Sequence, residues 1–229
     1  MKGAIKGLGY TPVISVVTPV YNTDEVWLRK CIESVRAQVY PHWELCLVND
    51  GSTRPHVRAI LDEYVTSEPR ILVEHLDRNQ GIAGASSHAL KLASGDFVAL
   101  LDHDDELPPE ALFEVVKRLN DTPDLDLIYT DEDKLEADGR RTEPFFKPDW
   151  SPDLLSSMNY ITHLSVFRRS LLSEIGGFRH GLDGSQDYDL LLRFTERTER
   201  IAHIAKVLYH WRKIPGSAAA SLRGQAPRL

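Results

Sequence analysis

Short apolar runs alternate along the first 131 residues with longer segments whose apolar positions recur every three or four residues. The short runs are rich in β-branched side chains and end at polar turns, which predicts buried strands at 13–20, 43–50, 70–76, 96–101 and 125–131. The longer segments predict helices at 26–38, 55–66, 81–94 and 108–120. Asp24 is a candidate N-cap of the first helix, Gly95 follows the third, and Pro108 opens the last.

This alternation predicts an α/β fold with a mostly parallel central sheet and helices on both of its faces. The crossovers between parallel strands should be right-handed. Ligands bind such sheets beyond the carboxyl ends of the strands. The residues that directly follow each strand are therefore the candidates for function.

The pattern changes after residue 131. Segment 143–155 is rich in proline and aromatic residues and is interpreted as a packed loop. Apolar runs predict further strands at 162–169 and 201–212, and a Leu/Phe stripe predicts a helix at 186–197.

Composition favours one large domain. The chain has 229 residues, of which 42% are hydrophobic, enough to bury a full core. We expect an N-terminal extension at 1–12, a single domain at 13–217, and at 218–229 a tail or a linker to further domains of a longer protein. The net charge of −7 argues against a nucleic-acid partner, because general binding to nucleic acid needs a basic face.

The two cysteines, Cys31 and Cys46, stand among apolar residues and are expected to be buried, reduced thiols, as in a reducing compartment. No apolar run approaches the roughly 20 residues of a membrane-spanning helix, and the first residues lack the apolar core of a signal peptide. We therefore expect the chain in the cytoplasm, either free or peripherally associated with the inner face of the membrane.

The fourth predicted strand stops against Asp102, Asp104, Asp105 and Glu106, four carboxylates within five residues that repel one another. Along an extended segment Asp102 and Asp104 point to the same side. Two carboxylates on one side suit Mg²⁺ or Mn²⁺, and a metal would relieve the repulsion. Asp105 and Glu106 would favour the N-terminus of the helix that follows. The alternative is a solvated acidic turn.

Polar residues and glycines also follow the first three strands. They are Thr18, Pro19 and Tyr21, then Asp50 and Ser52, then Arg78 and Gly81. Each group alone also fits a turn or a helix cap. Together they favour a ligand site, because each is placed at the same edge of one sheet.

Seven motifs, in order, resemble family 2 glycosyltransferases with the GT-A fold. "VVTPVYN", "VNDGST", "RNQGIAGASSHAL" and "GDFVALLDHDDELPPEAL" resemble the nucleotide-sugar-binding half, and "GGFR", "GSQDYDLLLR" and "YHWRKIPGS" resemble the acceptor half. The resemblance covers 13–217. It implies a Rossmann-like sheet, a nucleotide-sugar half at 13–105 and a smaller acceptor half at 106–217. It also implies an inverting enzyme of bacterial surface-polysaccharide type.

The resemblance implies roles for individual residues. Tyr21 would stack on the base, Asp50 would bind the uracil or thymine edge, and Asp102 would hold the ribose. The full nucleotide-sugar set is Thr18, Pro19, Tyr21, Asp50, Ser52, Arg78, Gly81, Asp102, His103 and Arg212. Asp104, in the D-x-D motif, and His210 would bind Mn²⁺ or Mg²⁺. His163 is expected to be structural or solvent-facing.

Asp187 would be the catalytic base, in the place of the Asp of a Glu-Asp pair in the family. Here the pair is Gln186-Asp187, which removes a neighbouring negative charge. The alternative role for Asp187 is an N-cap of the helix that follows. Gln186, Trp150 and Trp211 are candidate acceptor contacts, although both tryptophans could instead pack in the core.

The implied reaction is a metal-dependent single displacement with inversion. A UDP- or dTDP-linked sugar would pass to a hydroxyl of a glycan or a lipid-linked saccharide. The alternative is an inactive nucleotide-sugar-binding module of a larger assembly. A phosphate-accepting receiver domain is much shorter, and a nucleotidylyltransferase would need a glycine-rich basic loop after Val17 that is absent. The sequence names neither the sugar nor the acceptor.

Overall fold

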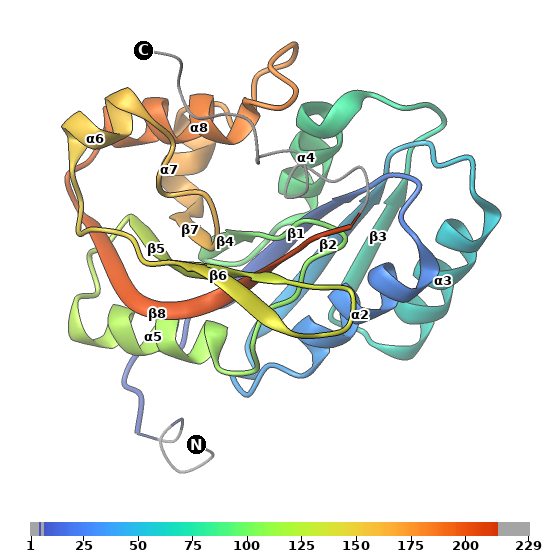
Figure 1. Cartoon of the computed structure of the whole chain (residues 1–229), viewed down its shortest axis with the longest axis horizontal. Helices are drawn as coiled ribbons and strands as arrows, with labels where there is room; N and C mark the ends of the chain where they lie inside the picture. Colours follow the sequence, from blue (N-terminus) through green and yellow to red (C-terminus); the bar gives the residue numbers. More distant parts are fainter. Residues whose placement is uncertain (1–4, 6, 215–229) are drawn as a thin grey trace.

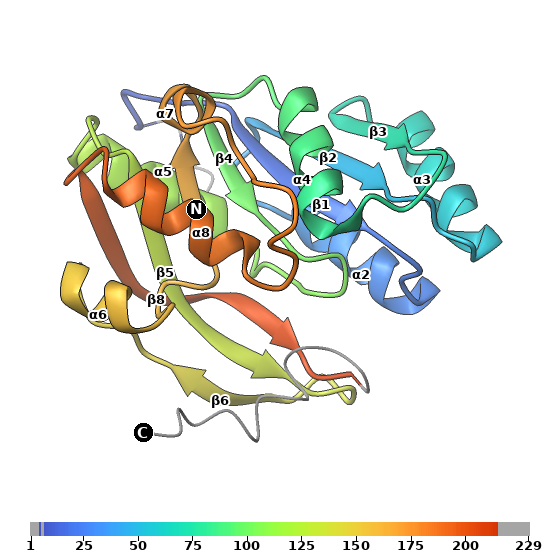
Figure 2. The same ribbon diagram turned by 90° about the horizontal axis from the view of Figure 1, so that it is seen from above.

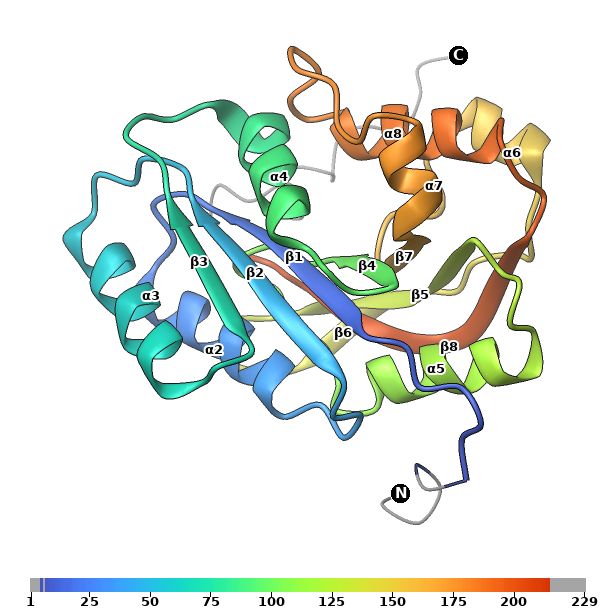
Figure 3. The same cartoon turned by 180° about the vertical axis from the view of Figure 1, so that it is seen from behind.

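A computed structural model describes residue 5 and residues 7–214. They form an eight-stranded sheet with helices on both faces (Figures 1 and 3). The strand order is β3-β2-β1-β4-β7-β5-β6, and β8 pairs with β5. This is the mostly parallel sheet flanked by helices that the alternation predicts.

The first half of the chain supplies four neighbouring parallel strands of the sheet. Its strands are β1 (Ile14–Val20), β2 (Trp43–Asn49), β3 (Ile71–His75) and β4 (Phe97–Leu100). Its helices are α2 (Glu25–Arg36), α3 (Pro55–Ser67), α4 (Gly81–Leu92) and α5 (Ala111–Asp121). The predicted strands and helices of this half are therefore confirmed, with ends that differ by a few residues.

The second half extends the same sheet. Its elements are β5 (Leu127–Leu135), β6 (Arg141–Phe145), α6 (Pro152–Ser157), β7 (Ser165–Arg168), α7 (Arg169–Glu174), α8 (Gln186–Thr195) and β8 (Ile201–Arg212). Strand β7 lies antiparallel between β4 and β5, so it joins the two halves. Strands β5, β6 and β8 lie side by side at one end of the sheet (Figure 2).

The interpretation of 143–155 as a loop is wrong, because the segment contains the end of β6 and most of α6. Strand β6 pairs with β5 alone and is mostly exposed, and an edge strand of this kind tolerates Pro144. Helix α6 has Pro152 in its first turn, and the Ser151 side chain accepts a hydrogen bond from the Leu154 backbone. Both prolines therefore stand where regular structure admits them.

Of three predicted helix ends, one is confirmed and two differ. The Asp24 cap is confirmed, since its carboxylate accepts a hydrogen bond from the Val26 backbone at 3.0 Å. Helix α5 begins at Ala111 rather than 108. Gly95 is not a helix cap, because α4 ends at Leu92. It passes so close to β1 that an added Cβ would lie 2.6 Å from the carbonyl oxygen of Val13.

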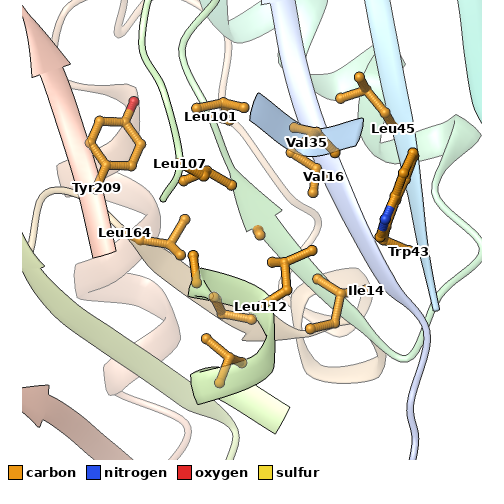
Figure 4. Packing of buried hydrophobic residues seen from close by; sticks show 14 of the residues in the cluster. Ile14, Val16, Val35, Trp43, Leu45, Leu101, Leu107, Leu112, Leu164 and Tyr209 are labelled. Carbon is orange, nitrogen blue, oxygen red and sulfur yellow. The ribbon is translucent and has the colours of Figure 1, made fainter. Parts of the chain in front are cut away.

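Two hydrophobic clusters cover the two faces of the sheet. One packs α2, α3 and α5 against it and brings Ile14 of β1 together with Leu112 of α5 and Tyr209 of β8 (Figure 4). The other packs α4, α7 and α8 against the opposite face. Across residue 5 and residues 7–214, no helix has the length and apolar character to cross a membrane.

Both cysteines are free and buried, as predicted, one in each cluster. Burial raises the pKa of the Cys31 thiol well above its usual value and that of Cys46 to about 12. We expect neither to react with iodoacetamide in the native protein at pH 8, and both to react in guanidinium chloride. Mass spectrometry of the alkylated protein checks this, and a native adduct on either residue would contradict it.

Candidate active site

Two adjoining cavities open beyond the carboxyl ends of the first-half strands. The first, of about 570 Å³, contains Asp102 and Asp187 and is called the aspartate cavity. The second, of about 470 Å³, contains Tyr21 and is called the tyrosine cavity. Pro19 and Ile82 line both, so the two cavities share a wall.

The tyrosine cavity gathers five of the predicted donor residues. They are Pro19, Tyr21, Asp50, Gly81 and His103. The Tyr21 side chain is among the more exposed large side chains, at 43%. The Asp50 carboxylate accepts a hydrogen bond from the Gln80 backbone at 2.7 Å, and burial raises its pKa. The cavity therefore combines an aromatic ring with a carboxylate.

Four other predicted donor residues line neither cavity, namely Thr18, Ser52, Arg78 and the buried Arg212 of β8. Thr18 is buried within β1. The Ser52 hydroxyl accepts a hydrogen bond from the Asn22 backbone at 3.0 Å, which ties together the loops after β1 and β2. Arg78 is exposed. Its backbone packs on Gly51, where a Cβ would lie 2.5 Å from the Arg78 carbonyl carbon.

Asp187 faces the aspartate cavity from the first turn of α8. Its Oδ2 accepts a hydrogen bond from the side-chain amide of Asn159 at 3.0 Å. The N-cap of α8 is Ser185, so Asp187 is not the cap of this helix. The Gln186 side chain also lines the cavity and accepts a hydrogen bond from the Gly184 backbone at 2.7 Å.

The acidic run separates into exposed and buried carboxylates. Asp102 lines the aspartate cavity with its side chain 39% exposed. Asp104 is mostly buried, and burial, with the charge of Asp102, raises its pKa. Asp105 is completely buried, which raises its pKa well above the usual value. Only one of these three carboxylates is therefore well exposed to a ligand.

The prediction that Asp105 and Glu106 favour the helix after them is wrong. The Asp105 carboxylate accepts hydrogen bonds from the Tyr209 hydroxyl at 2.6 Å and the Arg212 backbone at 2.7 Å. Glu106 forms an ion pair with Arg212 and exchanges backbone hydrogen bonds with His210. Both residues thus fix the acidic run onto β8, well before α5 begins.

His163 is a functional candidate that the sequence analysis assigned to structure or solvent. It lines the aspartate cavity, and its Nε2 lies 3.8 Å from Oδ2 of Asp102. Its ring stacks on Tyr209, with centroids 4.5 Å apart, and meets Trp211 edge-on. Asp102, Asp105 and His163 each offer a possible metal-ligand atom, all within 4.8 Å of one another.

The structure places His210 and Arg212, predicted to contact the metal and the diphosphate, inside the protein. His210 Nδ1 lies 2.6 Å from Oδ1 of Asp133. The Arg212 guanidinium is fully buried, pairs with Glu106, and donates to the Asp104 carbonyl at 2.7 Å. Neither residue lines either cavity, and the possible ligand group contains His163 instead of His210.

The two predicted tryptophans differ in position. Trp211 lines the aspartate cavity, and the Lys134 ammonium lies 3.2 Å from its ring centroid. Trp150 packs against the hydrophobic cluster of α4 and α8 and lines neither cavity. Of the two, Trp211 alone has the position of an acceptor contact.

Residues 15–176, well over half of the chain, match the family described as glycosyl transferase family 2. The chain belongs to this family. Curated relatives include the uncharacterized protein y4gI of Sinorhizobium fredii, 51% identical over 223 residues, and the O-antigen biosynthesis protein RfbC of Myxococcus xanthus, 48% identical over 221 residues. The matches cover 96% of this chain in both cases, but only 24% and 17% of those proteins. This family 2 chain thus spans a quarter or less of these relatives.

Solved structures share the fold of this family 2 chain. S. aureus TarS 1-349 in complex with UDP-GlcNAc has a TM-score of 0.76 and 22% identity over 91% of this chain and 60% of that one. The mannosyltransferase PcManGT of Pyrobaculum calidifontis, in complex with GDP-Man and Mn²⁺, has a TM-score of 0.67 and 20% identity, covering 88% of this chain and 57% of that one. These likenesses establish the GT-A fold.

Three functional candidates in the two cavities were not among the predicted functional residues. They are Asn159 and His163 in the aspartate cavity and Asp183 in the tyrosine cavity. Asn159 and Asp183 lie outside every predicted strand and helix, whereas His163 lies in the predicted strand 162–169. Asp183 accepts a hydrogen bond from the Ala83 backbone at 3.1 Å, 100 residues away in the chain. No short-range pattern signals contacts of this kind.

Proposed function

We propose that the chain is the transferase domain of an inverting enzyme that uses a nucleotide-diphosphate sugar. The observation that carries this proposal is the placement of Asp102 and Asp187 in one cavity that adjoins the tyrosine cavity. The nucleoside would occupy the tyrosine cavity and the sugar the aspartate cavity. Transfer would then occur where the cavities meet, beside Pro19.

In the tyrosine cavity, Tyr21 would stack on the base and Asp50 would accept a hydrogen bond from its edge. A pyrimidine with a ring N–H, as in UDP or dTDP, offers such a donor. Asp102 would bind the ribose from the adjoining aspartate cavity, and Ser52 and Arg78 would act through the loops that shape the tyrosine cavity.

In the aspartate cavity, Asp187 would take the proton of the acceptor hydroxyl. The acceptor oxygen then forms a bond to the anomeric carbon on the face opposite the nucleotide, and the bond to the diphosphate oxygen breaks. The anomeric configuration therefore inverts in a single displacement, and positioning supplies much of the rate. Trp211 and Gln186 would contact the acceptor or the transferred sugar.

The donor set next to Asp102 fits a divalent cation. Carboxylate oxygens suit Mg²⁺ and Mn²⁺, and an imidazole also suits a transition metal. We propose that Asp102 and His163 hold Mn²⁺ or Mg²⁺, with Asp104 and Asp105 lying behind them in the acidic run. When bound, the cation neutralises charge on the leaving diphosphate.

The acceptor is proposed to be a growing surface polysaccharide or its lipid-linked precursor. The name of RfbC, an O-antigen biosynthesis protein, supports this class. Because the chain spans 17% of RfbC, the complete protein is proposed to carry further domains.

Nucleotide sugars are expected to raise the melting temperature of the 229-residue chain, with a larger effect when Mn²⁺ is present. A ligand at about 100 times its Kd adds about 2.7 kcal/mol to the free energy of unfolding. A thermal-shift panel of UDP-, dTDP- and GDP-linked sugars measures this, and Tyr21→Ala should weaken the shift. The proposal fails if no donor stabilises the wild type with or without Mn²⁺. Donor binding without any release of the nucleoside diphosphate would favour an inactive binding module.

A further inference from the structure

A buried ion pair that belongs to neither cavity lies behind the wall of the aspartate cavity. The Lys147 side chain is completely buried and that of Glu132 is 3% exposed, and Lys147 Nζ lies 3.2 Å from Glu132 Oε2. The ammonium also donates to the backbone carbonyls of Ile161, at 2.5 Å, and of His163. The lysine thus binds the Glu132 carboxylate and also two backbone carbonyls of the segment 161–163.

Glu132 accepts hydrogen bonds from the donor groups of the same segment. Its Oε2 accepts from the Thr162 hydroxyl at 2.6 Å and from the His163 backbone at 3.1 Å. Thr162 has a φ of +40°, a left-handed conformation that strains a β-branched residue. Strained backbone of this kind persists only where its surroundings hold it in place.

The segment 161–163 contacts residues near both Asp102 and Asp187. Thr162 and His163 line the aspartate cavity, and His163 lies beside Asp102. On the other side, the Thr162 backbone donates to Asn159 Oδ1 at 3.4 Å, and the Asn159 amide donates to Asp187 at 3.0 Å. A continuous set of contacts therefore leads from the ion pair to the proposed base.

We propose that Lys147 and Glu132 are positioning residues for sugar transfer. Their ion pair fixes 161–163, so that Asn159 orients the Asp187 carboxylate and His163 stays beside Asp102. This inference rests on the proposed function and adds to it two residues that touch neither the donor nor the acceptor.

Stability alone does not call for an ion pair at this place. Apolar residues that replace a buried ion pair are often neutral or stabilising. Apolar side chains could not, however, donate to the carbonyls of Ile161 and His163 or accept from Thr162. The specific contribution of the pair is the conformation of the cavity wall.

The test compares Lys147→Met with the double variant Lys147→Met/Glu132→Gln. The single change removes the closer ammonium and leaves the buried Glu132 carboxylate with Lys134, whose Nζ lies 3.6 Å from Oε1, so a loss of melting temperature is expected. The double change removes that charge and should recover most of the melting temperature. The glutamine amide at position 132 cannot replace the lysine's hydrogen bonds to the carbonyls of Ile161 and His163. The kcat should therefore stay 10- to 100-fold below wild type, about the loss that small misplacements of reacting groups cause.

A control is the ion pair between Asp126, which is buried, and Arg168, whose side chain is 24% exposed. The Arg168 Nε lies 2.8 Å from Asp126 Oδ1, and neither residue lines either cavity. Arg168→Met/Asp126→Asn should lower the melting temperature without changing kcat. The readouts are the melting temperature, the donor Kd by calorimetry, and kcat for release of the nucleoside diphosphate with water as acceptor. All rates are measured well below each melting temperature.

The outcomes separate this inference from the proposed function. A double variant with near-wild-type donor Kd and a kcat lowered at least tenfold supports the positioning role. If the wild type releases the nucleoside diphosphate and the double variant does so equally fast, the positioning role is wrong although the function stands. An equal loss of kcat in the control pair would also overturn it. If the wild type neither binds nor cleaves any donor of the panel, the proposed function itself fails.

Discussion

Asp187→Asn is expected to lower the rate of sugar transfer by about 10²- to 10⁴-fold, the contribution of a positioned general base. Asparagine keeps the shape of the side chain and an oxygen that can accept from Asn159, but it cannot take a proton from the acceptor. Donor binding should change little, because Asp187 does not line the tyrosine cavity, where the nucleoside would bind, and asparagine keeps the shape of the wall beside the sugar. Rates of transfer and of nucleoside diphosphate release, with the donor Kd, measure the two effects separately.

Asp189→Asn is the matched control for this substitution. Asp189 lies two residues further along α8, and its carboxylate accepts from Arg193 at 2.7 Å and 2.9 Å rather than lining a cavity. This variant should keep the wild-type rate. A wild-type rate in Asp187→Asn would show that another group removes the acceptor proton.

The glutamine at position 186, where the family has a glutamate, has a local explanation at the start of α8. Its side-chain oxygen accepts from the Gly184 backbone and so folds the turn that leads into α8. An amide does this without a second negative charge beside Asp187. We therefore interpret Gln186 as compatible with a basic role for its neighbour.

Arg212→Met is expected to lower the free energy of unfolding by about 3 kcal/mol, the cost of breaking a buried ion pair from one side. The Arg212 guanidinium is completely buried, pairs with Glu106, and lies 4.3 Å from the ring centroid of Trp27. It also binds the Asp104 carbonyl, so its loss should loosen the acidic run, which keeps its hydrogen bonds to Tyr209 and to the β8 backbone, and should lower the rate of donor cleavage. Urea denaturation and the rate of nucleoside diphosphate release measure the two effects.

Arg140→Met provides the comparison for a surface ion pair. Arg140 pairs with Asp138 on the surface, where such a pair contributes less than about 1 kcal/mol. If Arg212→Met destabilises the protein no more than Arg140→Met, the acidic run does not depend on this arginine.

The strands and helices of the first half could be predicted because each depends on local periodicity. Strand β1 is buried along its whole length, and the stripe on α2 buries Leu28, Ile32 and Val35. The edge strand β6 could not be predicted because it is mostly exposed and carries no apolar alternation. Helix α7 could not be predicted because its six residues bury only Leu172, which gives no helical stripe.

The structure brings Asp102, Asp187 and Trp211 to one cavity, but the motifs did not reveal the direction of each side chain of β8. Its pairing with β5 shifts register twice, so simple alternation along the strand does not say which residues point inward. His210 and Arg212 consequently turn into the protein. The buried role of Asp105 depends on Tyr209 and Arg212, more than 100 residues away, which no local pattern reveals.

The attachment of the acidic run to β8 has a consequence for how the enzyme is made. During synthesis on the ribosome, 102–106 emerges long before 209–212, and its main anchors do not yet exist. The chain between 106 and 209 must close into a loop, at a cost in conformational entropy, before the stabilising contacts between these segments can form. The nascent chain can thus acquire its first strands early, whereas the proposed site is complete only after β8, the last strand of the described residues, has been made.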